Sequence, residues 1–186
     1  PLPRGTGFQF GNEIFGGSIP AKYVPSVEKG IRDSLDRGTI AGYQVVDIKA
    51  TVFDGKYHDV DSSDIAFQIA GSLSIKAAMP LADPILLEPI VKVEITVPEE
   101  YMGDIMGDLN SRRGRILGTE HAGRYQKIKA TVPEAEMYQY SSQLRSMTQG
   151  RGTFTMEFET YEEVPRDKVA KVIDESKKYQ EEQESK

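Results

Sequence analysis

Thr96-Val97-Pro98-Glu99 recurs 35 positions later as Thr131-Val132-Pro133-Glu134, and this repeat decides the fold of the second half of the chain. Each copy closes a stretch in which apolar and polar residues alternate, which is typical of a strand with one buried face. The alternating apolar residues are Val91, Val93, Ile95 and Val97 in the first stretch and Ile128, Ala130 and Val132 in the second. Equal motifs in equal contexts predict two copies of one supersecondary unit.

The residues after each copy follow a helical period that ends at a Gly-Arg pair, Gly114-Arg115 or Gly150-Arg151. The helical apolar positions are Met102, Ile105, Met106 and Leu109 after the first copy, and Met137, Tyr140, Leu144 and Met147 after the second. Further strands are expected at residues 115–119 and 153–161. Two tandem strand-helix-strand units predict a ferredoxin-like βαββαβ domain over residues 88–163. Gly103 and Gly107 are expected to let the first helix lie close to the sheet.

Residues 1–84 alternate strand and helix patterns, which predicts a separate α/β domain. Strands are expected at residues 8–15 and 43–53, and helices at residues 24–37, with Pro25 in the first turn, and 62–78. Ile65, Ile69 and Leu73 are expected to pack the second helix on the sheet. At least one partner strand is expected to precede the chain, which starts without Met and reads as a fragment. The whole chain is thus predicted to be α+β, with residues 165–186 forming a C-terminal helix and tail.

Composition argues against several classes of protein. The net charge is −6, and neither half of the chain nor its tail has an excess of basic residues, so binding to nucleic acid by bulk charge is not expected. There are no cysteines for a disulfide framework, and no run approaches the ~18 apolar residues of a membrane span. No phosphate-binding loop, metal-ligand spacing or paired catalytic carboxylates are visible, so we predict a binding module without a catalytic or metal site.

The loop Gly55 to Ser63 contains His58, one of only two histidines in the chain. Asp61 is expected to cap the following helix, and Val60 and Ile65 are expected to form a hydrophobic staple beside the cap. His58 would then project from a braced turn. The alternative is an ordinary solvated loop histidine, which is the commoner case.

Arg112, Arg113 and Arg115 form the one tight basic cluster. They follow a predicted helix, where cations stabilise the C-terminal end of the helix dipole. The alternative is contact with RNA phosphates. The residues themselves leave both interpretations open.

Longer motifs along almost the whole chain, to about residue 173, resemble bacterial elongation factor G. They are Gly16-Gly17-Ser18-Ile19-Pro20, Ala41-Gly42-Tyr43, Tyr57-His58-Asp59-Val60-Asp61-Ser62-Ser63, Leu87-Glu88-Pro89-Ile90, Gly107-Asp108-Leu109-Asn110-Ser111-Arg112-Arg113-Gly114, and Leu144-Arg145-Ser146 with Gly150-Arg151-Gly152. The resemblance covers the family's fourth and fifth domains. Ser18 departs from the valine that many members carry.

The resemblance implies a mechanical role on the ribosome. The fourth domain would be elongated and ribosomal-protein-like, with a left-handed βαβ crossover. Its tip would enter the small-subunit decoding site and contact the tRNA–mRNA duplex during translocation. The implied tip residues are Gly16, Gly17, Ser18, Ile19, Pro20, Lys56, Tyr57, His58 and Asp59. The ferredoxin-like fifth domain would face the large subunit near the sarcin–ricin loop.

The same resemblance implies a cytoplasmic, monomeric protein whose GTPase activity, with GTP and magnesium, lies in other domains of the parent. This chain would then need no cofactor of its own. Three other interpretations stand beside this one. They are a tetracycline-resistance ribosomal protection protein or an elongation factor G paralogue, a ferredoxin-like module that binds a small ligand, and an enzyme that uses its scattered acidic residues.

Overall fold

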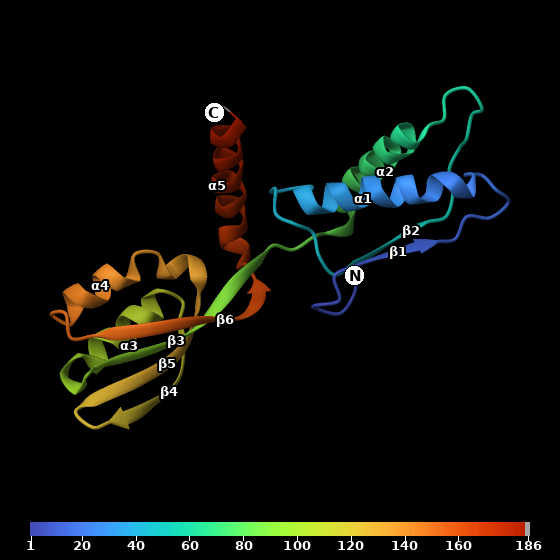
Figure 1. Cartoon of the computed structure of the whole chain (residues 1–186). Coiled ribbons are helices and arrows are strands. Elements are labelled where there is room, and N and C mark those ends of the chain that lie inside the picture. Colours follow the sequence, from blue (N-terminus) through green and yellow to red (C-terminus); the bar gives the residue numbers. More distant parts are fainter. Residues whose placement is uncertain (185–186) are drawn as a thin grey trace. The chain divides into compact units, whose positions relative to one another are not determined.

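The computed structural model describes residues 1–184, which form two compact units. One unit contains residues 1–84 together with the C-terminal helix, and the other is Ile85–Pro165. Figure 1 shows helices and strands in both units. The chain is therefore an α+β protein, as its sequence patterns predict.

The second unit has the ferredoxin-like plan. Its elements are β3 (Leu87–Pro98), the 3₁₀ turn η3 (Glu99–Tyr101), α3 (Met102–Ser111), β4 (Arg115–Ala122), β5 (Tyr125–Pro133), the 3₁₀ turn η4 (Glu134–Met137), α4 (Tyr140–Met147) and β6 (Thr153–Glu163). The strands form one antiparallel sheet in the order β4-β5-β3-β6. The repeated tetrapeptides lie at the ends of the two central strands, and each leads through a 3₁₀ turn into a helix, which explains the sequence repeat.

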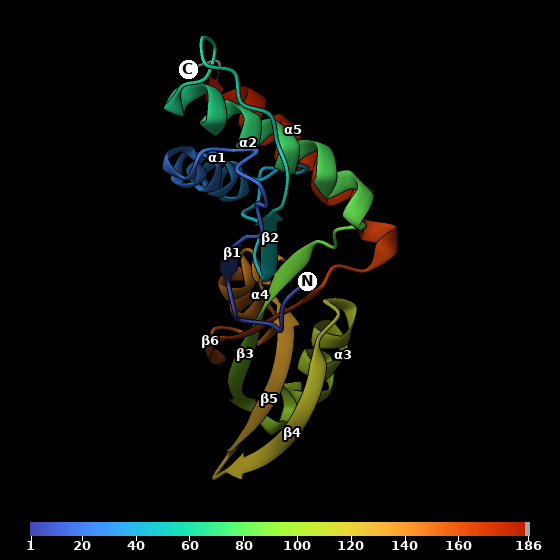
Figure 2. The ribbon, with the colours of Figure 1, turned by 90° about the vertical axis from the view of Figure 1, so that its right-hand side faces the viewer.

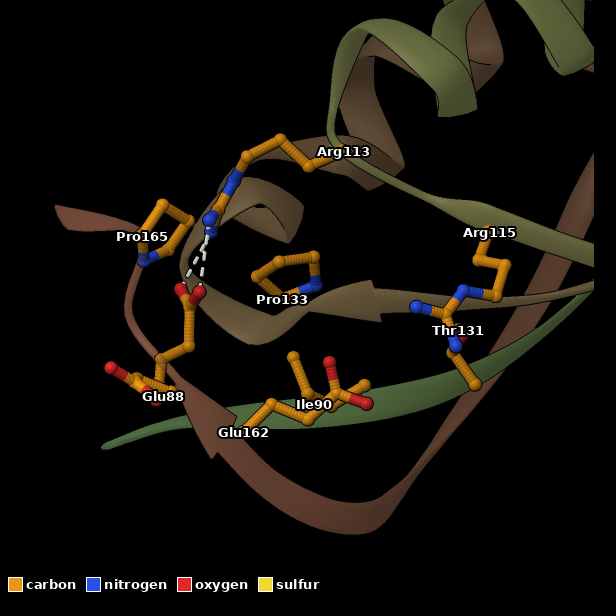
Figure 3. Close-up of a pocket in the computed structure, with 9 residues that line it drawn as sticks. Glu88, Ile90, Arg113, Arg115, Thr131, Pro133, Glu162 and Pro165 are labelled. Atoms are coloured by element: carbon orange, nitrogen blue, oxygen red, sulfur yellow. Dashed lines mark hydrogen bonds and ion pairs between the residues drawn. The ribbon is translucent and has the colours of Figure 1, made fainter. Parts of the chain in front are cut away.

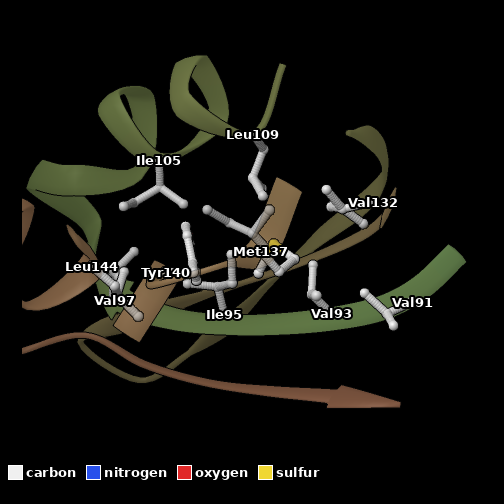
Figure 4. Packing of buried hydrophobic residues seen from close by; sticks show 12 residues of the cluster. Val91, Val93, Ile95, Val97, Ile105, Leu109, Val132, Met137, Tyr140 and Leu144 are labelled. Atoms are coloured by element: carbon white, nitrogen blue, oxygen red, sulfur yellow. The ribbon is translucent and has the colours of Figure 1, made fainter. Parts of the chain in front are cut away.

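The core of this unit lies between one sheet face and both helices (Figure 4). All the alternating residues of β3 and β5 that were predicted to be buried are at most 3 % exposed. Ile105 and Leu109 of α3 cover them and are fully buried. Each such side chain contributes about 1.5–3 kcal/mol through its removal from water.

Gly103 and Gly107 do not face the sheet, so that expectation is wrong. Both are exposed, and a Cβ atom built on either would meet nothing within 4 Å. Ile105 and Leu109 occupy the buried face instead. Close approach is needed at Gly114, where a Cβ would lie 2.6 Å from the Leu109 carbonyl oxygen, because the chain folds back tightly after α3.

The first unit contains a βαβ unit. Its strands β1 (Phe8–Asn12) and β2 (Ile48–Val52) are parallel and are joined through the 3₁₀ turn η1 (Ala21–Tyr23) and α1 (Val24–Arg37). The second strand is shorter than predicted. Asp47 has a φ of 59°, and its carboxylate accepts a hydrogen bond from the Gly7 N–H at 2.9 Å. This turn prevents residues 43–47 from continuing the strand.

Helix α2 (Asp64–Ala78), which leads into the 3₁₀ turn η2 (Met79–Ala82), presents a different face from the one predicted. Ile65, Ile69 and Leu73 are 68, 55 and 62 % exposed, so their packing on the sheet was a wrong expectation. The helix contacts α1 instead, with Phe67 and Gly71 buried (Figure 2). A Cβ on Gly71 would lie 2.5 Å from the Val27 carbonyl oxygen, so the two helix backbones approach each other directly at this point.

Residues 64–82 are long and apolar enough to cross a membrane by length and composition. A single helix of this kind is weak evidence for a membrane protein, and here the helix packs along α1. We therefore assign it to the fold of the first unit. The sequence contains no comparably long unbroken apolar run because serine, glycine and glutamine interrupt this stretch.

The C-terminal helix α5 (Arg166–Glu184) belongs to the first unit. The Ser176 hydroxyl donates a hydrogen bond to the Ala41 carbonyl oxygen at 2.6 Å, and Gln180 lies against Gly42. The chain therefore returns to its first unit after completing the second.

Candidate functional site

Two loops follow the carboxyl ends of the parallel strands β1 and β2, and this position brings them to one end of the first unit. The first loop, residues 13–20, leads to η1, and the second loop, residues 53–63, leads to α2. The second loop stands beyond the first turn of α2 in both views (Figures 1 and 2). Loops at the carboxyl ends of parallel strands are a common place for binding residues.

The two loops contact each other through Ile19 and Gly55. Ile19 is only 6 % exposed and belongs to the core cluster of this unit. A Cβ on Gly55 would lie 2.5 Å from the Ile19 Cδ1 atom, so glycine makes room for the isoleucine. The structure thus joins residues of the two sequence-predicted segments into one surface.

Gly16 and Gly17 form the exposed turn of the first loop. Their φ angles are 70° and 75°, a region that favours glycine because it has no Cβ atom. Ser18 is half-buried, and Pro20 leads into η1, where its carbonyl oxygen accepts from the Tyr23 N–H at 2.9 Å. The backbone of this loop is therefore exposed at Gly16-Gly17 and anchored at Ile19-Pro20.

The second loop is closed by a pair of hydrogen bonds between His58 and Ser62. The His58 N–H donates to the Ser62 Oγ atom at 3.0 Å, and the Ser62 N–H donates to the His58 carbonyl oxygen at 3.2 Å. The Tyr23 hydroxyl also donates to the Ser62 carbonyl oxygen at 3.3 Å. His58 consequently has a fixed backbone and an exposed side chain.

Ser63 caps α2, so the expected cap by Asp61 is wrong. Ser63 has an extended backbone, and its Oγ atom accepts from the Ala66 N–H at 3.1 Å. Val60 and Ile65 are 93 % and 68 % exposed, so the expected hydrophobic staple is also absent at these residues. Hydroxyl groups of two adjacent serines brace the loop instead of an acid and an apolar contact.

Aromatic rings form the base of this surface. The Tyr23 ring stacks on the Phe67 ring with centroids 4.7 Å apart and lies 5.9 Å from the Tyr57 ring. A hydrogen bond to Asp59, together with partial burial, raises the pKa of the Tyr57 hydroxyl above its usual value. Lys56, His58 and Asp59 are exposed around this half-buried tyrosine. The sequence motif gave no sign that Tyr23 and Tyr57 would meet.

The three clustered arginines have different environments. Arg112 pairs with Asp108 at 2.9 Å, lies over the Tyr140 ring and donates to the Glu136 carbonyl oxygen and the Gln143 side chain. Arg113 makes two hydrogen bonds to Glu88, at 2.9 and 2.6 Å (Figure 3). It makes a third, to Glu136, at 3.1 Å. These contacts favour a structural role for both side chains.

Arg115 is exposed and lies apart from the Arg113–Glu88 pair, which the dashed lines mark in Figure 3. It lines a small cavity of about 200 Å³ with Thr131, Glu162 and other residues of the second unit. Its lining contains both acidic and basic residues, namely Glu88, Glu162 and Glu163 with Arg113 and Arg115, so no single charge dominates. Among residues 1–184, no group of three or more His, Cys, Asp or Glu side chains is arranged to hold a metal ion.

Comparison with known proteins identifies relatives of both units. The family model described as "Elongation factor G, domain IV" matches residues 1–83, and "Elongation factor G C-terminus" matches residues 85–172. An elongation factor G of Aquifex pyrophilus is 57 % identical over 175 residues, which are 94 % of this chain and 25 % of that protein. A crystal structure of a Thermus thermophilus protein matches 93 % of this chain and 26 % of its own, with a TM-score of 0.78 and 43 % identity. The chain thus spans about a quarter of the length of these relatives.

Proposed function

This chain belongs to the elongation factor G family, and we propose that it is the part of a translational GTPase that contacts the decoding site of the ribosome during translocation. The paired loops would form the tip that meets the tRNA–mRNA duplex. The observation that carries this proposal is the braced surface in which Ile19 packs on Gly55 and hydrogen bonds hold His58 to Ser62. A surface built this way can press on RNA with little loss of its own shape.

The charge of the chain supports binding through a few placed residues. With a net charge of −6, the isolated chain gains little from general attraction to RNA. Lys56 and His58 would supply the local contacts, and Gly16 and Gly17 would let backbone N–H groups approach phosphates closely. We propose that the remainder of the parent protein docks this surface in place and raises its local concentration.

The second unit would face the large subunit near the sarcin–ricin loop. Arg115 is the member of the arginine cluster best placed for an RNA contact, since Arg112 and Arg113 are engaged by acidic and carbonyl groups. GTP hydrolysis, with its magnesium ion, would belong to other parts of a cytoplasmic, monomeric parent. This chain would act without a cofactor.

The test is a translocation assay on the full-length parent with His58→Ala. We expect a loss of translocation rate of at least about tenfold with GTP hydrolysis unchanged, because the substitution removes a contact and leaves the backbone brace intact. His121→Ala, at the other histidine of the chain, is the matched control and should translocate normally. Equal rates for both variants would contradict a working role for His58 and would favour a paralogue with another ribosomal task.

A further inference from the structure

Strand β6 forms an exposed edge of the sheet of the second unit. It pairs with β3 on one side, and its side chains other than Phe154 are exposed along its length. The register skips Glu159, because Val91 pairs with Phe158 and Ile90 pairs with Thr160. The straight, unbulged part of this edge is therefore the six residues Thr153 to Phe158. Its outward backbone groups are available to another strand.

Apolar side chains continue past the covered core along this edge. Met156 and Phe158 pair with the core residues Val93 and Val91, yet they are 47 % and 59 % exposed. Beside Met156 lies a hollow of about 450 Å³ that Met137 and Tyr138 also line. Phe154, on the same side of β6, is covered by the Tyr140 ring at 5.1 Å. Strand β6 therefore continues the sheet face that the helices cover, but Met156 and Phe158 on it remain exposed.

The opposite face of this edge carries one acidic residue, across from Lys92 of β3, and the end of the strand carries three more. Glu157 lies between Met156 and Phe158 in sequence and projects to the other face of the sheet, while Glu159, Glu162 and Glu163 follow. Within residues 1–184, none of these four glutamates takes part in an ion pair. Unpaired carboxylates on an edge repel acidic chains and attract basic ones.

We propose that the edge Thr153 to Phe158 binds an extended segment of a protein partner in which basic and apolar residues alternate. The segment would add a fifth strand to the sheet. Its apolar side chains would cover Met156 and Phe158, and its basic side chains would lie on the face of Glu157. A second copy of β6 fits poorly, because it would bring its own four glutamates to the same edge and like charges across paired strands are destabilising.

The probe is the peptide acetyl-Lys-Val-Lys-Val-Lys-Val-amide, titrated into the whole 186-residue chain at low salt and followed by isothermal titration calorimetry. We expect saturable binding and slower amide hydrogen exchange at Thr153 to Phe158. Phe158→Lys should weaken binding at least about tenfold, since it removes apolar contact and adds a like charge. Leu117→Lys is the matched control, because Leu117 is a 54 % exposed apolar residue on the opposite edge strand, β4, and it should leave binding unchanged.

A second peptide, acetyl-Lys-Pro-Lys-Pro-Lys-Pro-amide, keeps the charge but cannot pair as a strand. Equal affinity for both peptides would overturn the proposal, because charge alone would then explain binding. No binding at millimolar peptide, or an equal loss in Leu117→Lys, would also overturn it. So would protection of the β6 amides that increases with protein concentration in the absence of peptide, since that result would identify a second copy as the occupant.

Discussion

At the scale of single residues, short polar side chains set the shape of the paired loops. The sequence analysis predicted Asp61 as the cap of α2, although Ser62 and Ser63, which follow it, are also residue types that cap helices. In the structure, the two serines have different roles. Ser62 closes the loop on His58, and Ser63 caps α2 with φ and ψ angles of −144° and 165°. Asp61 remains exposed.

Replacing Ser63 by Ala should lower the free energy of unfolding by about 1 kcal/mol, because the Ala66 N–H loses its hydrogen-bond acceptor. Urea unfolding monitored by circular dichroism measures this change. Asp61→Ala is the matched control, and we expect a change within about 0.5 kcal/mol. A larger loss of unfolding free energy for Asp61→Ala than for Ser63→Ala would show that Asp61, and not Ser63, caps α2.

Asp47 provides a pH-dependent contribution to stability. The hydrogen bond from the Gly7 N–H lowers the pKa of the Asp47 carboxyl below its usual value, and further backbone donors and Arg4 act in the same direction. A lowered pKa stabilises the fold above the unfolded pKa of about 4, and this contribution is lost as pH falls through the folded value. Unfolding free energies measured from pH 6 to pH 3 should therefore fall more steeply for the wild type than for Asp47→Asn. If the unfolding free energies of the two proteins fell equally with pH, the charge of the Asp47 carboxylate would contribute nothing to stability.

At the scale of elements, the sequence predicted helices and strands best where the pattern of apolar residues was most regular. The repeat and the alternation of β3 and β5 predicted the ferredoxin-like unit because nearly every apolar position there serves the core. The same logic failed for α2. Its apolar residues Ile65, Ile69 and Leu73 mark a face that the sheet leaves exposed, and glycines made the contact with α1. Hydrophobic periodicity identifies the apolar face of a helix. It does not identify a close helix crossing that depends on glycines, because glycine has no side chain to contribute to the pattern.

This crossing predicts opposite effects for two glycine-to-alanine substitutions in helices. A Cβ on Gly30 of α1 would lie 1.9 Å from the Gln68 carbonyl oxygen, so Gly30→Ala should force α1 and α2 apart and cost about 2–3 kcal/mol of stability. Gly107→Ala in α3 meets open space and should stabilise the protein by about 0.5–1 kcal/mol, through better helix propensity. Thermal or urea unfolding of the two variants measures both effects. Destabilisation of similar size in both would contradict the close helix crossing.

At the scale of the whole molecule, two compact units carry different parts of the proposed function. The loop motifs and the family resemblance were readable from the sequence, and so was His58 as a candidate contact. The contact between Ile19 and Gly55 was not, because it joins segments 36 residues apart through a glycine that leaves space for a buried side chain. The pairing of Arg113 with acidic groups was also hidden, since its partners Glu88 and Glu136 come from distant parts of the second unit.

The central claim is that the paired loops contact RNA in the decoding site, and a cleaving probe attached at position 58 tests it most directly. This chain has no cysteine, so His58→Cys in a parent without other reactive thiols gives a single attachment site for an iron chelate that generates hydroxyl radicals. With the ribosome-bound protein, we predict cleavage of small-subunit RNA around the decoding site. Cleavage confined to large-subunit RNA, or none above the level of unlabelled protein, would contradict the claim.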